Sequence, residues 1–81
     1  MNSRFLLHHV HQPGECAIAF AAWKGFRSPL RHLSAPATCL QGGHAIWWVV
    51  EAQDTDTALG QLPPYLAART EATPISEVQI P

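Results

Sequence analysis

The chain has 81 residues and a mass of 8.9 kDa; 47% of its residues are hydrophobic, 14% are charged, and the formal net charge is −1. This length predicts one domain over residues 1–81, close to the lower size limit at which a hydrophobic core is stable alone. The apolar content argues against intrinsic disorder. Five basic residues against six acidic ones leave no positive surface for nucleic acid or for a membrane.

The apolar stretches and the cysteines indicate the compartment. The longest stretches, Cys16–Trp23 and Ala45–Val50, fall well below the ~18–20 residues needed to cross a bilayer. The apolar part of the first ten residues is too short for the core of a signal peptide. We therefore expect a cytoplasmic protein that does not contact a membrane. Cys16 and Cys39 are not spaced as CxxC, and a reducing compartment disfavours a disulfide between them.

The first half of the chain predicts a strand, a helix and a hairpin. The strand covers Phe5–His11 and stops at the turn signal Gln12-Pro13-Gly14. A helix is predicted over Glu15–Phe26, because apolar residues recur there at helical spacing. Thr38–Gln41 is predicted as a short second strand, and Gly42-Gly43 as the turn of a hairpin.

The second half begins with the clearest strand, His44–Ala52, whose centre is aromatic and β-branched. Asp54 is the predicted N-cap of a helix that ends at Pro63-Pro64, and the second proline can begin another short helix. Thr73–Ile80 alternates and predicts a fourth strand, which a proline confines to an edge. The order βαββαβ predicts an α+β, ferredoxin-like fold with an antiparallel four-stranded sheet and helices on one face.

Three parts of this pattern resemble a known superfamily. The turn Gly42-Gly43-His44, the segment WWVVEAQDTDTALGQLPPY and the final PISEVQIP are similar to small bacterial domains of the dimeric α+β-barrel superfamily. The resemblance implies a homodimer in which two sheets pack face to face. The superfamily includes monooxygenases, isomerases, stress proteins and small metal-binding proteins, some of which bind nickel. A fold of this kind selects no function by itself.

One group of polar residues predicts a metal site. His9 and His11 point to the same side of the first predicted strand, with Cα atoms ~6.5–7 Å apart. Cys16 follows five residues later, in the first turn of the predicted helix, where a thiolate is favoured. Two imidazoles and a thiolate suit zinc, nickel or copper rather than magnesium or calcium. Binding should weaken below about pH 6, where imidazole side chains are protonated.

Three other interpretations stay open at this point. The histidines can be solvated residues at a strand end, with Cys16 as a small apolar residue. A cofactor-independent monooxygenase or isomerase would use His9 or His11 as a general base beside a pocket under the helices. The chain can also be a non-catalytic dimeric module. We favour a non-enzymatic, metal-binding homodimer.

Two interpretations are open for His44, and two for the pair Trp47 and Trp48. In a ferredoxin-like sheet the first and third strands run parallel, which would place His44 some 15–20 Å from His11. His44 would then reach the ion only from the partner chain of a dimer, or would simply bond to a backbone carbonyl in the turn. Trp47 and Trp48 point to opposite faces, one into the core and one into the dimer interface, with an aromatic ligand pocket as the alternative.

Overall fold

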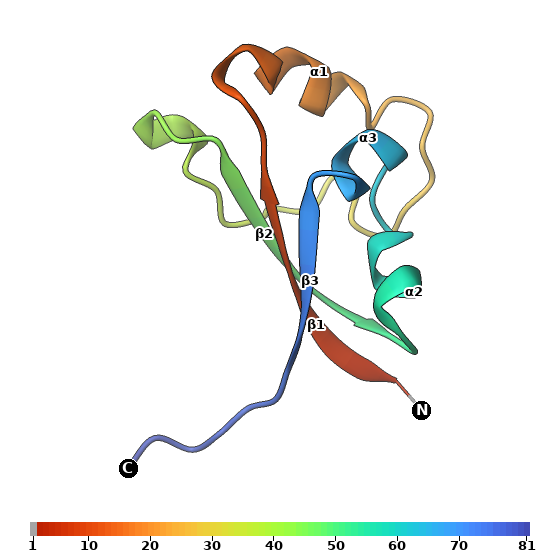
Figure 1. Ribbon diagram of the computed structural model, residues 1–81, viewed down its shortest axis with the longest axis vertical. Helices are drawn as coiled ribbons and strands as arrows, with labels where there is room; N and C mark the ends of the chain where they lie inside the picture. The colour runs from red at the N-terminus through yellow and green to blue at the C-terminus, as the bar shows by residue number, and fades with distance from the viewer. Residues whose placement is uncertain (1) are drawn as a thin grey trace.

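The computed structural model describes residues 2–81 and contains a three-stranded antiparallel sheet (Figure 1). β1 (Ser3–Val10) is the central strand, with β2 (Ala45–Ala52) on one side and β3 (Thr70–Ile75) on the other. Both pairings are antiparallel. The chain is therefore a small α+β protein.

Short helical segments connect the strands. η1 (Pro13–Glu15) and α1 (Cys16–Ala21) follow β1, and η2 (Cys39–Gln41) precedes β2. α2 (Thr55–Leu59) and α3 (Pro64–Ala67) lie between β2 and β3. No helix within residues 2–81 is both long and apolar enough to cross a bilayer.

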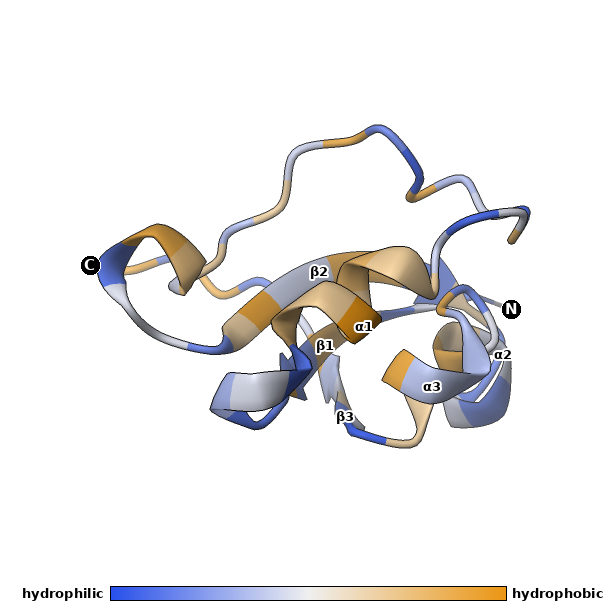
Figure 2. Cartoon of the chain, turned by 90° about the horizontal axis from the view of Figure 1, so that it is seen from above, coloured by the Kyte–Doolittle hydropathy of each residue, from blue (hydrophilic) through white to orange (hydrophobic). Residues whose placement is uncertain are grey.

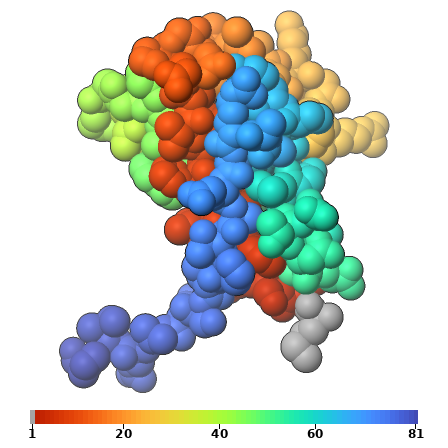
Figure 3. All heavy atoms as spheres, in the orientation of Figure 1, coloured from red at the N-terminus to blue at the C-terminus, as the bar shows by residue number. Residues whose placement is uncertain are grey.

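One face of the sheet is buried and carries the core. Along β1 the side chains alternate, so that Phe5, Leu7 and His9 are buried while Leu6 and His8 are only half-buried. Apolar residues of β2, of α2, of α3 and of the turn between the two helices complete the core on this face: Ile46, Trp48, Val50, Ala52, Ala58, Leu62 and Leu66. The last residues of the chain extend away from this body as an arm (Figure 3).

The expected four-stranded ferredoxin-like sheet is wrong. Thr38–Gln41, the predicted second strand, is replaced by η2, because Gly42 adopts a left-handed φ of 83° and closes a turn there. Within the described chain, only an isolated bridge between Ala37 and Ile46 remains of this strand. The resemblance to the dimeric α+β-barrel superfamily does not hold either, because three strands cannot form its sheet.

The expected direction of the strands is also wrong. β1 and β2 run antiparallel, from the pair Ser3–Ala52 to the pair Val10–Ala45, rather than parallel. The end of β1 therefore lies beside the beginning of β2. This arrangement brings together two segments of the chain that the parallel sheet would have kept apart.

Several element boundaries differ from those expected. The helix predicted over Glu15–Phe26 ends at Ala21, because the chain turns and Gly25 takes a φ of 77°. The last strand covers Thr70–Ile75 rather than residues 73–80, and Pro74 is tolerated because β3 is an edge strand. The prediction for Asp54 is confirmed, since its carboxylate accepts the Thr57 N–H at 2.8 Å as an N-cap.

Candidate metal centre

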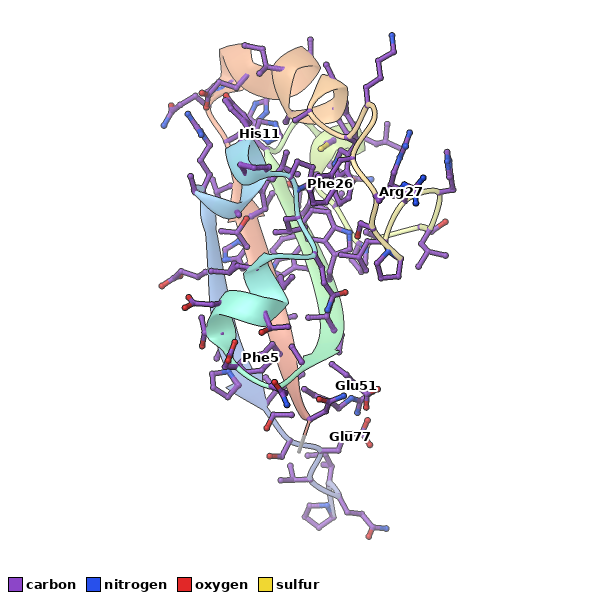
Figure 4. All side chains as sticks on the ribbon, turned by 90° about the vertical axis from the view of Figure 1, so that its right-hand side faces the viewer. Phe5, His11, Phe26, Arg27, Glu51 and Glu77 are labelled. Carbon is purple, nitrogen blue, oxygen red and sulfur yellow. The ribbon has the colours of Figure 1, made fainter. Side chains whose placement is uncertain are left out.

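The end of β1 directs two histidines into the protein. His9 has no exposed surface and His11 is 4% exposed, both on the face that carries the core. They point the same way because side chains two positions apart in extended backbone share a face. The expectation that His9 and His11 lie on one side of this strand is thus met. Figure 4 shows His11 at the end of the sheet that lies beneath α1.

The turn after β1 brings Cys16 back over the end of the strand. Within it, the Gln12 N–H donates to Glu15 Oε1 at 2.8 Å, and the Glu15 N–H donates to the Gln12 carbonyl oxygen at 2.9 Å. The Tyr65 hydroxyl donates to Glu15 Oε2 at 2.6 Å and joins the turn to α3. This bond from Tyr65, followed by the bond from Gln12, lowers the pKa of Glu15 below its ordinary value. The Glu15 carboxylate therefore stabilises the turn, and each of its two oxygens already accepts a hydrogen bond.

His44 reaches the same place from the segment before β2. The Thr38 carbonyl oxygen accepts the Gly43 N–H at 2.8 Å, and the Thr38 hydroxyl accepts the Ala45 N–H at 3.1 Å. Gly43 is required by space: a Cβ there would lie 2.1 Å from Thr38 Oγ1. These contacts fix the backbone on both sides of His44. The His11 N–H donates to the His44 carbonyl oxygen at 3.1 Å, which continues the β1–β2 ladder by one pair.

The three side chains converge on a small volume. Cys16 Sγ lies 3.3 Å from His11 Nε2 and 3.2 Å from His44 Nδ1. One atom from each of these residues falls in a group whose members all lie within 4.8 Å of one another. Around a tetrahedral zinc ion, neighbouring sulfur and nitrogen ligands are about 3.5 Å apart, given the usual metal–ligand bond lengths. The two sulfur–nitrogen distances are slightly shorter than this, and the cluster is close enough to hold a metal ion.

His9 lies behind His11 rather than in the cluster. His9 Nε2 is 3.1 Å from His11 Nδ1, and His9 Nδ1 is 3.2 Å from Thr70 Oγ1. The Thr70 hydroxyl donates to the Leu66 carbonyl oxygen at 2.6 Å, so its oxygen is left to accept from His9 Nδ1–H. Burial, followed by the nearby His11, lowers the pKa of His9 and favours its neutral form.

The hydrogen-bond network then assigns the proton positions. A neutral His9 that donates through Nδ1 must accept through Nε2, and the donor facing it is His11 Nδ1–H. His11 is left with a free lone pair on Nε2, the nitrogen that faces Cys16 Sγ. A second residue that binds the far nitrogen of a ligand histidine is the usual arrangement around protein-bound metals.

The structure brings together three of the four residues expected at the site, His11, Cys16 and His44, and places His9 outside this cluster. His44 belongs to the cluster within a single chain, so the expected separation of 15–20 Å and the need for a partner chain are wrong. His9 contacts His11 instead of the centre of the cluster. Thr70 was missed, and only the sheet order could have found it, since the pair His9–Thr70 crosses from β1 to β3.

Comparisons with protein-family models, with curated proteins and with solved structures give no match for this chain. The chemistry of the site itself therefore indicates what the protein can bind. Its donor set is two imidazole nitrogens and one thiol sulfur, which suits borderline and soft metal ions. Cys16 and His44 are half-buried, which gives an ion a path from solvent.

Proposed function

We propose that this protein binds one soft or borderline divalent ion per chain, zinc or nickel, through His11 Nε2, Cys16 Sγ and His44 Nδ1. The observation that carries the proposal is the close approach of one sulfur and two ring nitrogens from three separate segments. Hard ions such as magnesium and calcium prefer oxygen ligands and are disfavoured by this set.

The bonds around His11 support the same proposal. His9 orients the imidazole and, in neutral His11, holds the proton on Nδ1, so that the lone pair of Nε2 faces the cluster. Three protein ligands leave a fourth position of a tetrahedral ion for water. Because Cys16 and His44 are half-buried, this position is accessible from solvent.

We propose binding rather than catalysis. A general base needs a free lone pair within reach of substrate. His9 has no exposed surface and both its ring nitrogens have partners, so it does not meet this requirement. The Glu15 carboxylate accepts from Tyr65 and from the Gln12 backbone and lies 3.6 Å from Arg69 Nε. His11 Nε2 has a lone pair, but it faces Cys16 Sγ at 3.3 Å, and His11 is only 4% exposed. The two histidines of the monooxygenase or isomerase interpretation are therefore poorly placed to act on a substrate.

The test is calorimetric titration of the full chain, prepared without a histidine tag, with zinc and with nickel. We expect one ion per chain. Cys16→Ser and His44→Gln should each weaken binding by more than the roughly 10–100-fold that loss of a supporting residue costs. Cys39→Ser and His8→Gln are matched controls, because Cys39 lies outside the cluster and His8 points to the opposite face of β1.

Cobalt(II) gives a second readout of the same site. A thiolate bound to cobalt produces a charge-transfer absorption, which should appear with wild type and with Cys39→Ser and should be absent with Cys16→Ser. If neither zinc nor nickel gives a saturable heat, the cluster is a hydrogen-bonded polar end of the sheet and the proposal fails.

A further inference from the structure

A cavity of about 450 Å³ lies on the buried face of the sheet, between β2 and the segment of residues 22–40. This segment runs from α1 to η2 without a strand and, apart from η2, without a helix, and it arches beside the sheet (Figure 2). Its aromatic lining consists of Phe20, Trp23 and Trp48, and β2 also contributes Ile46. The volume falls in the range of sites that bind small molecules, about 300–1,000 Å³.

The aromatic rings form a connected surface. The Trp23 and Trp48 ring centroids are 5.9 Å apart with an interplanar angle of 54°, so the two indoles meet at an angle. Phe26 packs edge-on against Trp23, with ring centroids 6.3 Å apart and an interplanar angle of 76°. Phe20 is 57% exposed, which is high for an apolar side chain. A planar apolar ligand would cover these rings.

The lining of the cavity includes basic side chains, Arg31 and His32, and no acidic ones. Residues 16–50 contain no aspartate or glutamate but hold three of the five basic residues. The ion pairs within the described chain join Arg4 to Glu77 and Arg69 to Glu15, and neither involves Arg31.

Arg31 has guanidinium hydrogen-bond donors that can bind a ligand. Its Nη1 donates to the Phe26 carbonyl oxygen at 3.5 Å, a long bond that leaves the other guanidinium N–H groups free. A planar guanidinium binds a carboxylate through two parallel hydrogen bonds. Beside an apolar cavity, this arrangement selects an apolar ligand that carries an anionic group.

The backbone next to Arg31 is strained. His32 has a φ of 68°, and among residues 2–81 no other residue besides glycines has a positive φ. Such a conformation costs energy, and strained residues of this kind cluster at active sites and ligand sites, where the surroundings impose them. Here it forms part of the bend in which the Leu33 N–H donates to the Leu30 carbonyl oxygen at 3.3 Å.

We propose that this cavity binds an aromatic carboxylate, with its ring against Trp23 and Trp48 and its carboxylate on Arg31. The site is independent of the metal centre, because His11, Cys16 and His44 do not line the cavity. The chain would then carry two sites of different chemistry on the same face of one sheet.

Calorimetric titration with 2-naphthoate and with the neutral 2-naphthylmethanol tests this assignment. We expect one 2-naphthoate per chain and at least tenfold weaker binding of the neutral compound. Arg31→Gln should weaken 2-naphthoate binding at least tenfold. Arg27→Gln removes the same charge from the same segment and should change it less than twofold, because Arg27 is exposed and lies outside the lining (Figure 4).

One further measurement keeps the result interpretable. Intermolecular NOEs between the naphthalene ring and the indoles of Trp23 and Trp48 should appear in wild type, and they need no variant. Absence of binding, equal binding by Arg31→Gln, or NOEs to Trp47 on the opposite face would each overturn the proposal.

Discussion

His11 and His44 are cross-strand partners, joined by a backbone hydrogen bond of 3.1 Å and with ring centroids 5.4 Å apart. The bond lies one pair beyond the last paired residues of β1 and β2, Val10 and Ala45. Side chains that are directly opposite in an antiparallel pair have Cβ atoms about 4.5–5.5 Å apart, which suits two ligands of one ion. The sheet therefore positions two of the three candidate ligands, and the turn to α1 positions the third, Cys16.

The supporting role of His9 can be measured through metal affinity. His9→Gln should lower the affinity for zinc about 10–100-fold, because His11 loses the partner that holds its ring and its Nδ1 proton. Thr70→Val should act in the same direction through His9, with a smaller effect. Competition with a chelator of known affinity measures both, and His8→Gln is the control. An unchanged affinity in His9→Gln would show that His11 needs no such support.

The two thiols should respond differently to an ion. Both cysteines are free in the structure, which agrees with the expectation that no disulfide joins them. Unfolded, unreduced protein should therefore give two thiols per chain. In the native protein, saturating zinc should slow alkylation of Cys16 at least tenfold and leave Cys39 unchanged, as read by mass spectrometry of the labelled peptides. Equal rates with and without zinc would contradict Cys16 as a ligand.

Gly43 and Gly14 form a matched pair for stability. Gly43→Ala forces a Cβ against Thr38 and should lower the free energy of unfolding by about 1–3 kcal/mol, the usual cost of overpacking. Gly14→Ala meets nothing within 4 Å and should be neutral or stabilise the protein by about 0.4–1 kcal/mol. Denaturant unfolding of both variants makes the comparison. Equal effects would mean that Thr38 moves aside at little cost.

The N-cap of α2 should make stability depend on pH. The Thr57 N–H, which binds the charged form of Asp54, lowers the pKa of this carboxyl below its ordinary value. The contribution is therefore present above the ordinary pKa of about 4 and is lost as the pH falls below it. Asp54→Ala should melt at a lower temperature at pH 7, and the difference from wild type should shrink toward pH 2. A difference that does not change with pH would contradict this origin.

The homodimer stays a prediction. The face of the sheet opposite the core carries Leu6, Val10, Trp47 and Val49; the two valines are 49% and 52% exposed. Trp47 stacks on His8 with a centroid distance of 4.9 Å. A second copy on this face would bury these side chains, so sedimentation at micromolar concentration should give twice the mass of the chain. Trp47→Glu should then yield monomers, and a monomeric wild type would refute the dimer.

The local part of the metal centre could be predicted from the sequence. The shared face of His9 and His11 follows from the twofold repeat of a strand, and the return of Cys16 follows from a turn of a few residues. The place of His44 depends on whether two strands run parallel or antiparallel, which is a property of the whole sheet. An expectation of four strands gave the wrong direction and hence the wrong distance.

The prediction of a helix over Glu15–Phe26 was wrong beyond Ala21 for a similar reason. Trp23 and Phe26 have helical spacing, and their rings do pack on each other, but in a turn rather than in a helix. The glycine at position 25 and the packing of Trp23 on Trp48 outweigh the helical pattern. Trp23 still packs against the sheet, whereas Ile18 and Phe20 are 53% and 57% exposed, so the helical pattern predicted only part of the burial of this segment.

The contact between Cys16 and His44 joins residues 28 positions apart, and the chain between them contains most of the irregular backbone. An ion at this contact would tether both ends of that loop to the same end of the sheet. Removal of the ion would release the loop while the hydrogen bonds of the sheet remain, so the change would be local rather than global. A bound ion would then hold this segment in place and protect its three trypsin sites, Lys24, Arg27 and Arg31, from cleavage.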